Sequence, residues 1–244
     1  MAQFSFGAGS LYGISTASGT PTPVKFGTLQ EVSIETSFNT KELYGSYQFP
    51  VAIARGTGKV TGKAKFAQIN GAIYNELFFG QTSTVGQVAT ITGEAGNIPA
   101  TPFTITVANS ATFVDDLGVQ FSLTGAPLTK VAATPSTGEY SVSAGVYTFN
   151  AADTLLDVSI SYTYTIAATG NTIVVNNQLL GTTPFFSCYF SSIYNGKAVN
   201  YQLPLCTSGK LTMATKLEDF VVPELDFSAF ADASGKIMTI STAE

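Results

Sequence analysis

The segment from Lys216 to Lys236 gathers residues whose types could do chemistry. It holds five carboxylates, those of Glu218, Asp219, Glu224, Asp226 and Asp232. Carboxylate pairs can hydrolyse glycosidic bonds, and carboxylate clusters can bind calcium. The chain has no histidine, which excludes the usual general base, histidine-based triads and nearly all zinc or non-haem iron sites. Its two cysteines form no CxxC motif, so the carboxylates are the chemistry left to consider.

The spacing of these acids argues against catalysis. If residues 225–231 form a strand, Asp226 and Asp232 lie on the same face. At about 3.3 Å per residue they are roughly 20 Å apart, well beyond the separation of about 5 to 9.5 Å in glycosidases. Glu224 and Asp226 are closer, but one carboxylate pair without further ligands is weak support for a calcium site. We therefore expect no catalytic residue, no metal site and no cofactor, and we predict that the protein is not an enzyme.

These acids fit the outer face of a hairpin that is followed by a turn. Asp232 can accept local backbone hydrogen bonds within "DASGK", and Gly235 can supply a positive φ before a last strand, Ile237–Ser241. A helix that begins at Pro223 and is capped by Gly235 is the alternative interpretation of this segment.

The composition indicates a surface that other subunits cover. Of the 244 residues, 45% are hydrophobic and only 11% are charged, whereas soluble domains have about 25% charged residues. Interface cores are depleted in charge, so we expect an obligate assembly. No run of about 18 apolar residues is present, which disfavours a membrane-spanning helix. The first basic residue is Lys25, which disfavours a secretory signal and favours synthesis in a cytoplasm.

The net charge of −5 is unevenly distributed along the chain. Residues 81–166 carry six acids and a single base, Lys130, whereas the rest of the chain has ten acids and ten bases. Neither region has the basic excess of a nucleic-acid-binding clamp, so sequence-specific DNA binding is disfavoured.

Alternation of apolar and polar residues predicts a mainly β protein. The clearest predicted strands are Phe103–Val107, Val158–Thr165, Thr172–Val175, Phe185–Phe190 and Lys236–Ser241. Residues 65–80 differ, because four apolar residues there have helical spacing, followed by Gly80 as a C-terminal cap. These four are Phe66, Ile69, Ile73 and Leu77. The segment predicts one amphipathic helix that packs on the sheet.

The two cysteines, Cys188 and Cys206, flank a predicted hairpin whose turn is Asn195-Gly196. Counting outward from this turn pairs Cys188 with Leu203, and Cys206 with Phe185. In that register the two sulfur atoms face opposite sides, so a disulfide would need a bulge. We therefore predict two buried, reduced thiols.

A basic stripe follows the predicted strand "KVTGKAKF". Lys59, Lys63 and Lys65 share one face with Thr61, and Arg55 lies nearby. Two interpretations stay open for this stripe. It forms either a solvated strand face or a row of ion pairs with acids of a neighbouring subunit, which would tune association more than stability.

The chain divides into three parts on these grounds. Residues 1–24 are rich in Gly, Ser, Thr and Pro and predict an arm that orders only against a partner. Residues 25–80 and 167–244 form the core domain. Residues 81–166 predict an inserted β module, bounded by the Gly-rich loops "GQTSTVGQ" and "AATGN".

Three passages carry a resemblance to a known family. Leu43–Gly80 and Lys216–Ser241 resemble major tail tube proteins of tailed bacteriophages, and Gly118–Thr165 is similar to the immunoglobulin-like β modules embedded in phage structural proteins. The resemblance covers most of the chain, but it rests on patterns of turns and aromatic residues rather than on one signature. It implies a β-sandwich or half-barrel with one flanking helix, which forms hexameric rings that stack into a tube for genome ejection.

The resemblance also implies partners and an interface. The partners would be further copies of the chain, other tail proteins such as the tape measure, sheath and terminator, and DNA that passes without specific binding. The chain would lie in the virion tail after synthesis in the cytoplasm of a bacterial host. In that family a long loop reaches the adjacent ring, and Thr36–Pro50 is the matching stretch. Its expected anchors are Leu43, Tyr44, Tyr47 and Phe49.

Two alternatives stay open from the sequence. The stretch Thr36–Pro50 could be an ordinary loop with buried aromatic residues. The protein as a whole could be a virion-surface module, in which the acidic β insert binds a host glycan or receptor and the remainder is an attachment scaffold.

Overall fold

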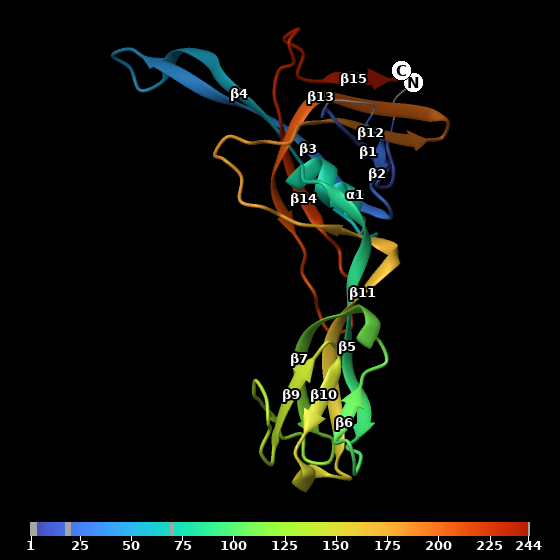
Figure 1. Ribbon diagram of the computed structural model, residues 1–244. Coiled ribbons are helices and arrows are strands. Elements are labelled where there is room, and N and C mark those ends of the chain that lie inside the picture. The colour runs from blue at the N-terminus through green and yellow to red at the C-terminus, as the bar shows by residue number, and fades with distance from the viewer. Residues whose placement is uncertain (1–3, 18–20, 69–70, 244) are drawn as a thin grey trace. The chain divides into compact units, whose positions relative to one another are not determined.

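The computed structural model describes residues 4–17, 21–68 and 71–243. Strands dominate these residues, so the prediction of a mainly β protein is confirmed. The chain forms two compact units (Figure 1). Unit 1 comprises Met1–Thr82 with Ile173–Glu244, and unit 2 comprises Ser83–Thr172. The predicted insert began at residue 81 and ended at residue 166.

Unit 1 is built on an antiparallel sheet of eight strands with the order β2-β1-β12-β13-β14-β4-β3, in which β15 also pairs with β13. The strands are β1 (Ser10–Ser15), β2 (Val24–Lys25), β3 (Leu29–Tyr44), β4 (Pro50–Phe66), β12 (Phe186–Tyr194), β13 (Lys197–Thr212), β14 (Glu224–Ala229) and β15 (Thr239–Thr242). Strand β3 lies at one end of the sheet and β2 at the other.

Strand β1 corrects one prediction. It lies within residues 1–24, which we expected to order only against a partner, yet it pairs with β12 from Ser10↔Ser191 to Ser15↔Phe186. Leu11 is fully buried in the core. The apolar side chain of Leu11 and the edge of β12 therefore supply the ordering contacts for residues 10–15 within the chain itself.

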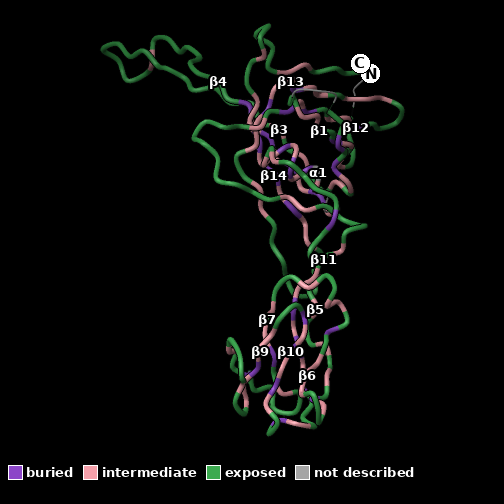
Figure 2. The backbone as a smooth tube through the Cα atoms, in the orientation of Figure 1, coloured by how far each residue is buried: buried purple, intermediate pink, exposed green. Residues whose placement is uncertain are grey.

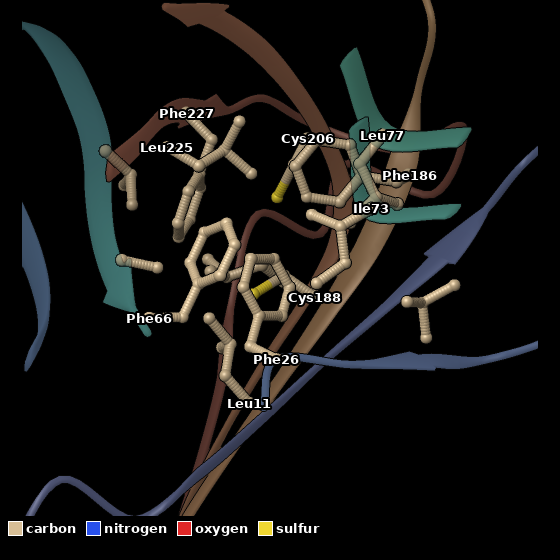
Figure 3. Close-up of a cluster of buried hydrophobic side chains, with 14 residues drawn as sticks. Leu11, Phe26, Phe66, Ile73, Leu77, Phe186, Cys188, Cys206, Leu225 and Phe227 are labelled. Carbon is tan, nitrogen blue, oxygen red and sulfur yellow. The ribbon is translucent and has the colours of Figure 1, made fainter. Parts of the chain in front are cut away.

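A short helical segment covers the core of unit 1. It consists of α1 (Gly71–Tyr74) and a π-helical continuation, η1 (Asn75–Phe79), which ends at Gly80 with φ 62°. Ile73 and Leu77 are fully buried (Figure 3), as their spacing predicted. The cap at Gly80 is confirmed, and its N–H donates to the Asn75 carbonyl at 2.6 Å.

The helix is shorter than the predicted range of residues 65–80. Phe66 belongs to β4 instead, because the alternation that buries Val60, Ala64 and Phe66 continues to the end of that strand. Ile69 lies outside the described residues. The position of Phe66 fits the apolar spacing of a helix as well as that of a strand. Its pairing with Leu29 on β3 shows that it belongs to the strand.

Both cysteines lie in the core of unit 1 (Figure 3). They are free and buried, as predicted. The turn at Asn195-Gly196 is also confirmed, with positive φ angles of 49° and 75°. Cys188 pairs with Leu203 as expected, but a register shift places Cys206 opposite Phe186 rather than Phe185. The prediction that the sulfur atoms face opposite sides is wrong, because this irregularity turns both into the same core.

Unit 2 contains a three-stranded sheet, with order β5-β11-β7, and a four-stranded sheet, with order β6-β10-β9-β8. Its elements are β5 (Ser83–Asn97), β6 (Thr104–Thr106), η2 (Ser110–Thr112), β7 (Phe113–Phe121), β8 (Thr129–Lys130), β9 (Glu139–Ser143), β10 (Val146–Phe149), η3 (Ala151–Asp153) and β11 (Asp157–Ile173). Tyr140, Tyr147 and Tyr162 lie at the centre of its own hydrophobic core. Unit 2 thus has a core separate from that of unit 1.

Candidate functional site

Of the five carboxylates between Lys216 and Lys236, those of Glu224 and Asp226 lie on β14 as expected, and that of Asp232 follows it. Glu218 and Asp219 precede the strand. In β14, Leu225 and Phe227 are buried, while Glu224 and Asp226 point to the opposite face of the sheet. The strand interpretation is therefore confirmed and the helical alternative is wrong. The last strand, β15, begins at Thr239, two residues later than predicted.

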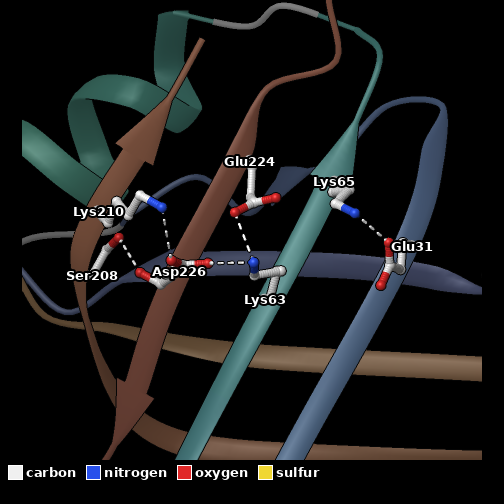
Figure 4. Close-up of polar contacts among 7 residues, drawn as sticks. All are labelled: Glu31, Lys63, Lys65, Ser208, Lys210, Glu224 and Asp226. Atoms are coloured by element: carbon white, nitrogen blue, oxygen red, sulfur yellow. Dashed lines mark hydrogen bonds and ion pairs between the residues drawn. The ribbon is translucent and has the colours of Figure 1, made fainter. Parts of the chain in front are cut away.

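Each acid on β14 is engaged by lysines of the neighbouring strands (Figure 4). Lys63 Nζ lies 2.8 Å from Glu224 Oε1 and 3.8 Å from Asp226 Oδ1, and Lys210 Nζ lies 3.8 Å from Asp226 Oδ2. The Lys63 hydrogen bond lowers the pKa of Glu224 and raises that of Lys63. A general acid needs a raised pKa, so this environment favours ion pairing over acid catalysis at Glu224.

Asp232 forms the predicted turn. Its carboxylate accepts hydrogen bonds from the backbone N–H groups of Ser234 and Lys236, both at 2.9 Å, and Gly235 has a φ of 81°. Within residues 4–17, 21–68 and 71–243, no three acidic, cysteine or histidine side chains are close enough to hold a metal ion.

The basic stripe has the predicted alternation but partners from its own chain. Lys63 and Lys65 lie on the face opposite to Val60 and Ala64, and Lys65 Nζ lies 2.6 Å from Glu31 Oε2 (Figure 4). Strands β3 and β14 flank β4 and supply these acids. For Lys63 and Lys65 the structure thus provides intramolecular ion pairs, and the contact with a neighbouring subunit stays a prediction for them as for Lys59 and Arg55.

Two of the predicted anchor residues, Leu43 and Tyr44, lie on a strand of a long β-hairpin. The other two, Tyr47 and Phe49, lie in the short loop at its tip, residues 45–49. We call Thr36–Lys59 the hairpin arm. Its two strands pair from Ser37↔Lys59 to Tyr44↔Pro50, because β-branched and aromatic residues continue through the stretch that we expected to be a loop. Figure 1 shows the arm projecting away from the rest of the unit 1 sheet, and Figure 2 shows that it is exposed along its length.

The arm presents a series of large apolar side chains to solvent. Tyr47 is 83% exposed and Phe49 is 80% exposed, and Leu43 and Tyr44 are also exposed. The interpretation of this stretch as a loop with buried aromatic residues is therefore wrong. Sequence reasoning missed three further exposed side chains of the arm, those of Phe38, Val51 and Ile53. The alternation in "PVAIARG" could have identified Val51 and Ile53 as one face of a strand.

Contacts within the arm hold its two strands together. Asn39 Nδ2 donates to Thr57 Oγ1 at 3.0 Å, and the Arg55 guanidinium lies over the Phe38 ring at 4.9 Å from its centroid. Within β3, Tyr44 donates a hydrogen bond to Glu42. A hairpin with such cross-strand contacts can present its apolar side chains without first having to order.

An apolar groove runs beside the base of the arm. It has a volume of about 650 Å³, and its walls include Phe38, Val60, Phe230, Ile237 and Met238. Exposed apolar surface thus continues from the arm onto the sheet. Large contiguous patches of this kind usually mark interaction sites.

Comparison with known proteins leaves this surface unassigned. No model of a known protein family matches the chain, and a search of curated proteins gave no match either. No helix of the described residues is long and apolar enough to cross a membrane.

Proposed function

We propose that this chain is a non-enzymatic structural subunit of a phage tail tube, which assembles with copies of itself into stacked hexameric rings. The observation that carries the proposal is the hairpin arm, whose aromatic side chains point into solvent. Surface aromatic residues of this kind are typical anchors of protein interfaces. Under the proposal, unit 1 forms the sandwich or half-barrel of the tube wall.

The sheet edges of unit 1 support lateral association. Strand β3, which has sixteen residues, is the edge strand on one side of the sheet. On the other side, the short strand β2 pairs with β1 only at Tyr12 and Gly13. Long unpaired edges promote pairing with another chain. In the proposed ring, the edge of one copy pairs with that of its neighbour, which removes both exposed edges.

The ion pairs on the face of β4 are compatible with a channel for DNA. Lys63 and Lys65 are matched by Glu224, Asp226 and Glu31, so their positive charge is largely compensated. Phosphate attraction scales with the number of free cations, so such a face would let DNA pass without holding it.

Unit 2 supports an alternative function. It has its own hydrophobic core and carries six acids against Lys130. As an independently packed module it could bind a glycan or receptor on a host cell, with unit 1 as the scaffold. The alternative predicts monomers or small oligomers that bind cells rather than tubes.

Negative-stain electron microscopy of the purified full chain separates the two functions. Rings or tubes of uniform bore support the tail tube proposal. Dispersed particles that sediment with bacterial cells contradict it and support the receptor-binding alternative.

A further inference from the structure

A cavity beside the helical segment of unit 1 contains an unpaired carboxylate. Glu76 is half-buried, and its Oε2 atom is buried without a hydrogen-bond partner among the described residues. The cavity has a volume of about 350 Å³ and lies between the end of β1, the η1 segment and the loop before β12. Glu76 is the only ionisable residue among the described residues that line it. A buried carboxylate oxygen without a partner is costly, so this cavity is suited to a cation.

Hydrogen bonds of the preceding residue, Asn75, fix the backbone around Glu76. Asn75 Nδ2 donates to the Gln81 carbonyl at 2.5 Å, and the Gln81 N–H donates to Asn75 Oδ1 at 2.9 Å. These two bonds close the end of η1 onto the chain that follows Gly80. The carboxylate is therefore presented by a fixed turn rather than by a mobile side chain alone.

The chemistry of the lining favours an organic cation over a metal ion. The cavity offers one carboxylate, whereas calcium is held by six to eight oxygen ligands that usually include several carboxylates. Its other polar groups are neutral, such as the Thr16 hydroxyl and the Gln178 amide, and its walls include Phe79 and Phe185. A guanidinium combines charge, several N–H donors and a flat face that stacks on aromatic rings. An arginine side chain fits this set of groups.

The chain has a single arginine, Arg55, and it lies exposed on the hairpin arm. Its guanidinium lies over the Phe38 ring, and no carboxylate within the described residues forms an ion pair with it. The arm points away from the helical segment of its own unit (Figure 1). Arg55 and Glu76 are thus carried by different elements of unit 1, β4 and η1.

We propose that Arg55 of one copy enters this cavity on a second copy and pairs with the second copy's Glu76. The contact joins two different surfaces, so it is heterologous. Each copy can therefore make the same contact with the next, which produces a ring or a filament. This inference rests on the proposed self-assembly and names the residues that carry one of its contacts. It would also give a partner to Glu76 Oε2, which has none among the described residues.

A charge-reversal experiment tests the pairing. Arg55→Glu and Glu76→Arg should each raise the critical concentration for assembly about tenfold or more, because each leaves a charge unpaired at a desolvated contact. The double variant should restore assembly toward the wild-type value. Lys41→Glu makes the same charge change on the same arm, and Glu76→Arg should not rescue it.

A second set of variants keeps the test valid if Glu76→Arg does not fold. Glu76→Gln and Arg55→Gln should each weaken assembly, and their combination should weaken it no further than either alone. Glu76→Gln should not lower the melting temperature of the unassembled subunit, because Glu76 Oε2 has no hydrogen bond to the described residues that the substitution could break. Three results would overturn the pairing while self-assembly stands. The two glutamine substitutions could weaken assembly independently, so that their effects on the critical concentration multiply. Glu76→Arg could rescue Lys41→Glu, or the single variants could assemble like the wild type. A wild-type chain that never assembles overturns both proposals.

Discussion

Lys63 Nζ lies 2.8 Å from Glu224 Oε1, across the boundary between β4 and β14. These residues are 161 positions apart in the sequence (224 − 63), and the sheet order makes them neighbours. The basic stripe of β4 and the acids of β14 are separate features of the sequence. In the fold they lie side by side and form one face on which the charges are paired. Ion pairing, rather than catalysis, is the role that this geometry supports for both.

The stability contributed by Glu224 should depend on pH. Its folded pKa is lowered by the Lys63 hydrogen bond, so its contribution is present above the unfolded value of about 4.3 and is lost as pH falls through the folded pKa. At neutral pH, Glu224→Gln should lower the free energy of unfolding by less than about 1 kcal/mol, since exposed pairs contribute little. Urea unfolding at pH 7 and in steps below pH 4.3 measures this difference.

Glu35→Gln is the matched control for that experiment. Glu35 lies on the same strand as Glu31 and forms no ion pair with the lysines of the described residues. Its substitution should leave the unfolding free energy unchanged at both pH values. An equal loss in the two variants would show that general charge, rather than the Lys63 contact, is responsible.

Asp116 should be the most sensitive carboxylate of unit 2. Its side chain is 4% exposed, accepts hydrogen bonds from Tyr140 at 2.7 Å and Tyr147 at 2.9 Å, and pairs with Lys130 at 3.0 Å. Asp116→Asn should destabilise unit 2 by about 3 kcal/mol, because it breaks a buried charge network. Thermal unfolding with hydrogen exchange on unit 2 peptides measures the loss.

The same network predicts limits of stability at both ends of the pH scale. Burial raises the pKa of Asp116, but the Tyr140 and Lys130 hydrogen bonds outweigh it, so the folded pKa is lowered and stability is lost as pH falls through it. Burial and Asp116 raise the pKa of Tyr147, so its contribution is lost above about pH 10. Asp115→Asn, at an exposed neighbouring position, should change neither limit.

The two thiols should be unreactive in the folded chain. Burial raises the pKa of Cys206 to about 12 and also raises the pKa of Cys188, so little thiolate is present at neutral pH. A thiol reagent should modify neither cysteine in the native protein and both after denaturation. Modification of the native protein, or fewer than two thiols after denaturation without reductant, would contradict the assignment of buried free cysteines.

Much of the fold follows from local pattern. The alternation along Lys59–Phe66 and Glu224–Ala229 identified both strands and their buried faces, and Asn195-Gly196 identified its hairpin. The register of Cys206 did not follow, because the irregularity between Phe186 and Cys188 depends on packing in the core. The length of the helix was overestimated, since the apolar spacing at Phe66 fits a helix as well as a strand.

The candidate site was only partly predictable for a related reason. Tyr47 and Phe49 were expected as anchors from the family resemblance, and the structure adds that both are exposed. The partners of Lys63 could not, because they depend on which strands become neighbours in the sheet. The Glu76 cavity was missed altogether, since its walls come from residues near positions 16, 76 and 180 that only the fold brings together.

Sedimentation velocity over a range of concentrations tests self-association through the arm most directly. The wild-type chain should form large species, whereas a Tyr47→Ser, Phe49→Ser variant should stay monomeric with an unfolding free energy within about 0.5 kcal/mol of wild type, because both residues are exposed. Leu123→Ser, at a 95% exposed position of unit 2, should assemble like the wild type. A wild-type chain that remains a monomer at high concentration, or an arm variant that assembles equally well, would contradict the account.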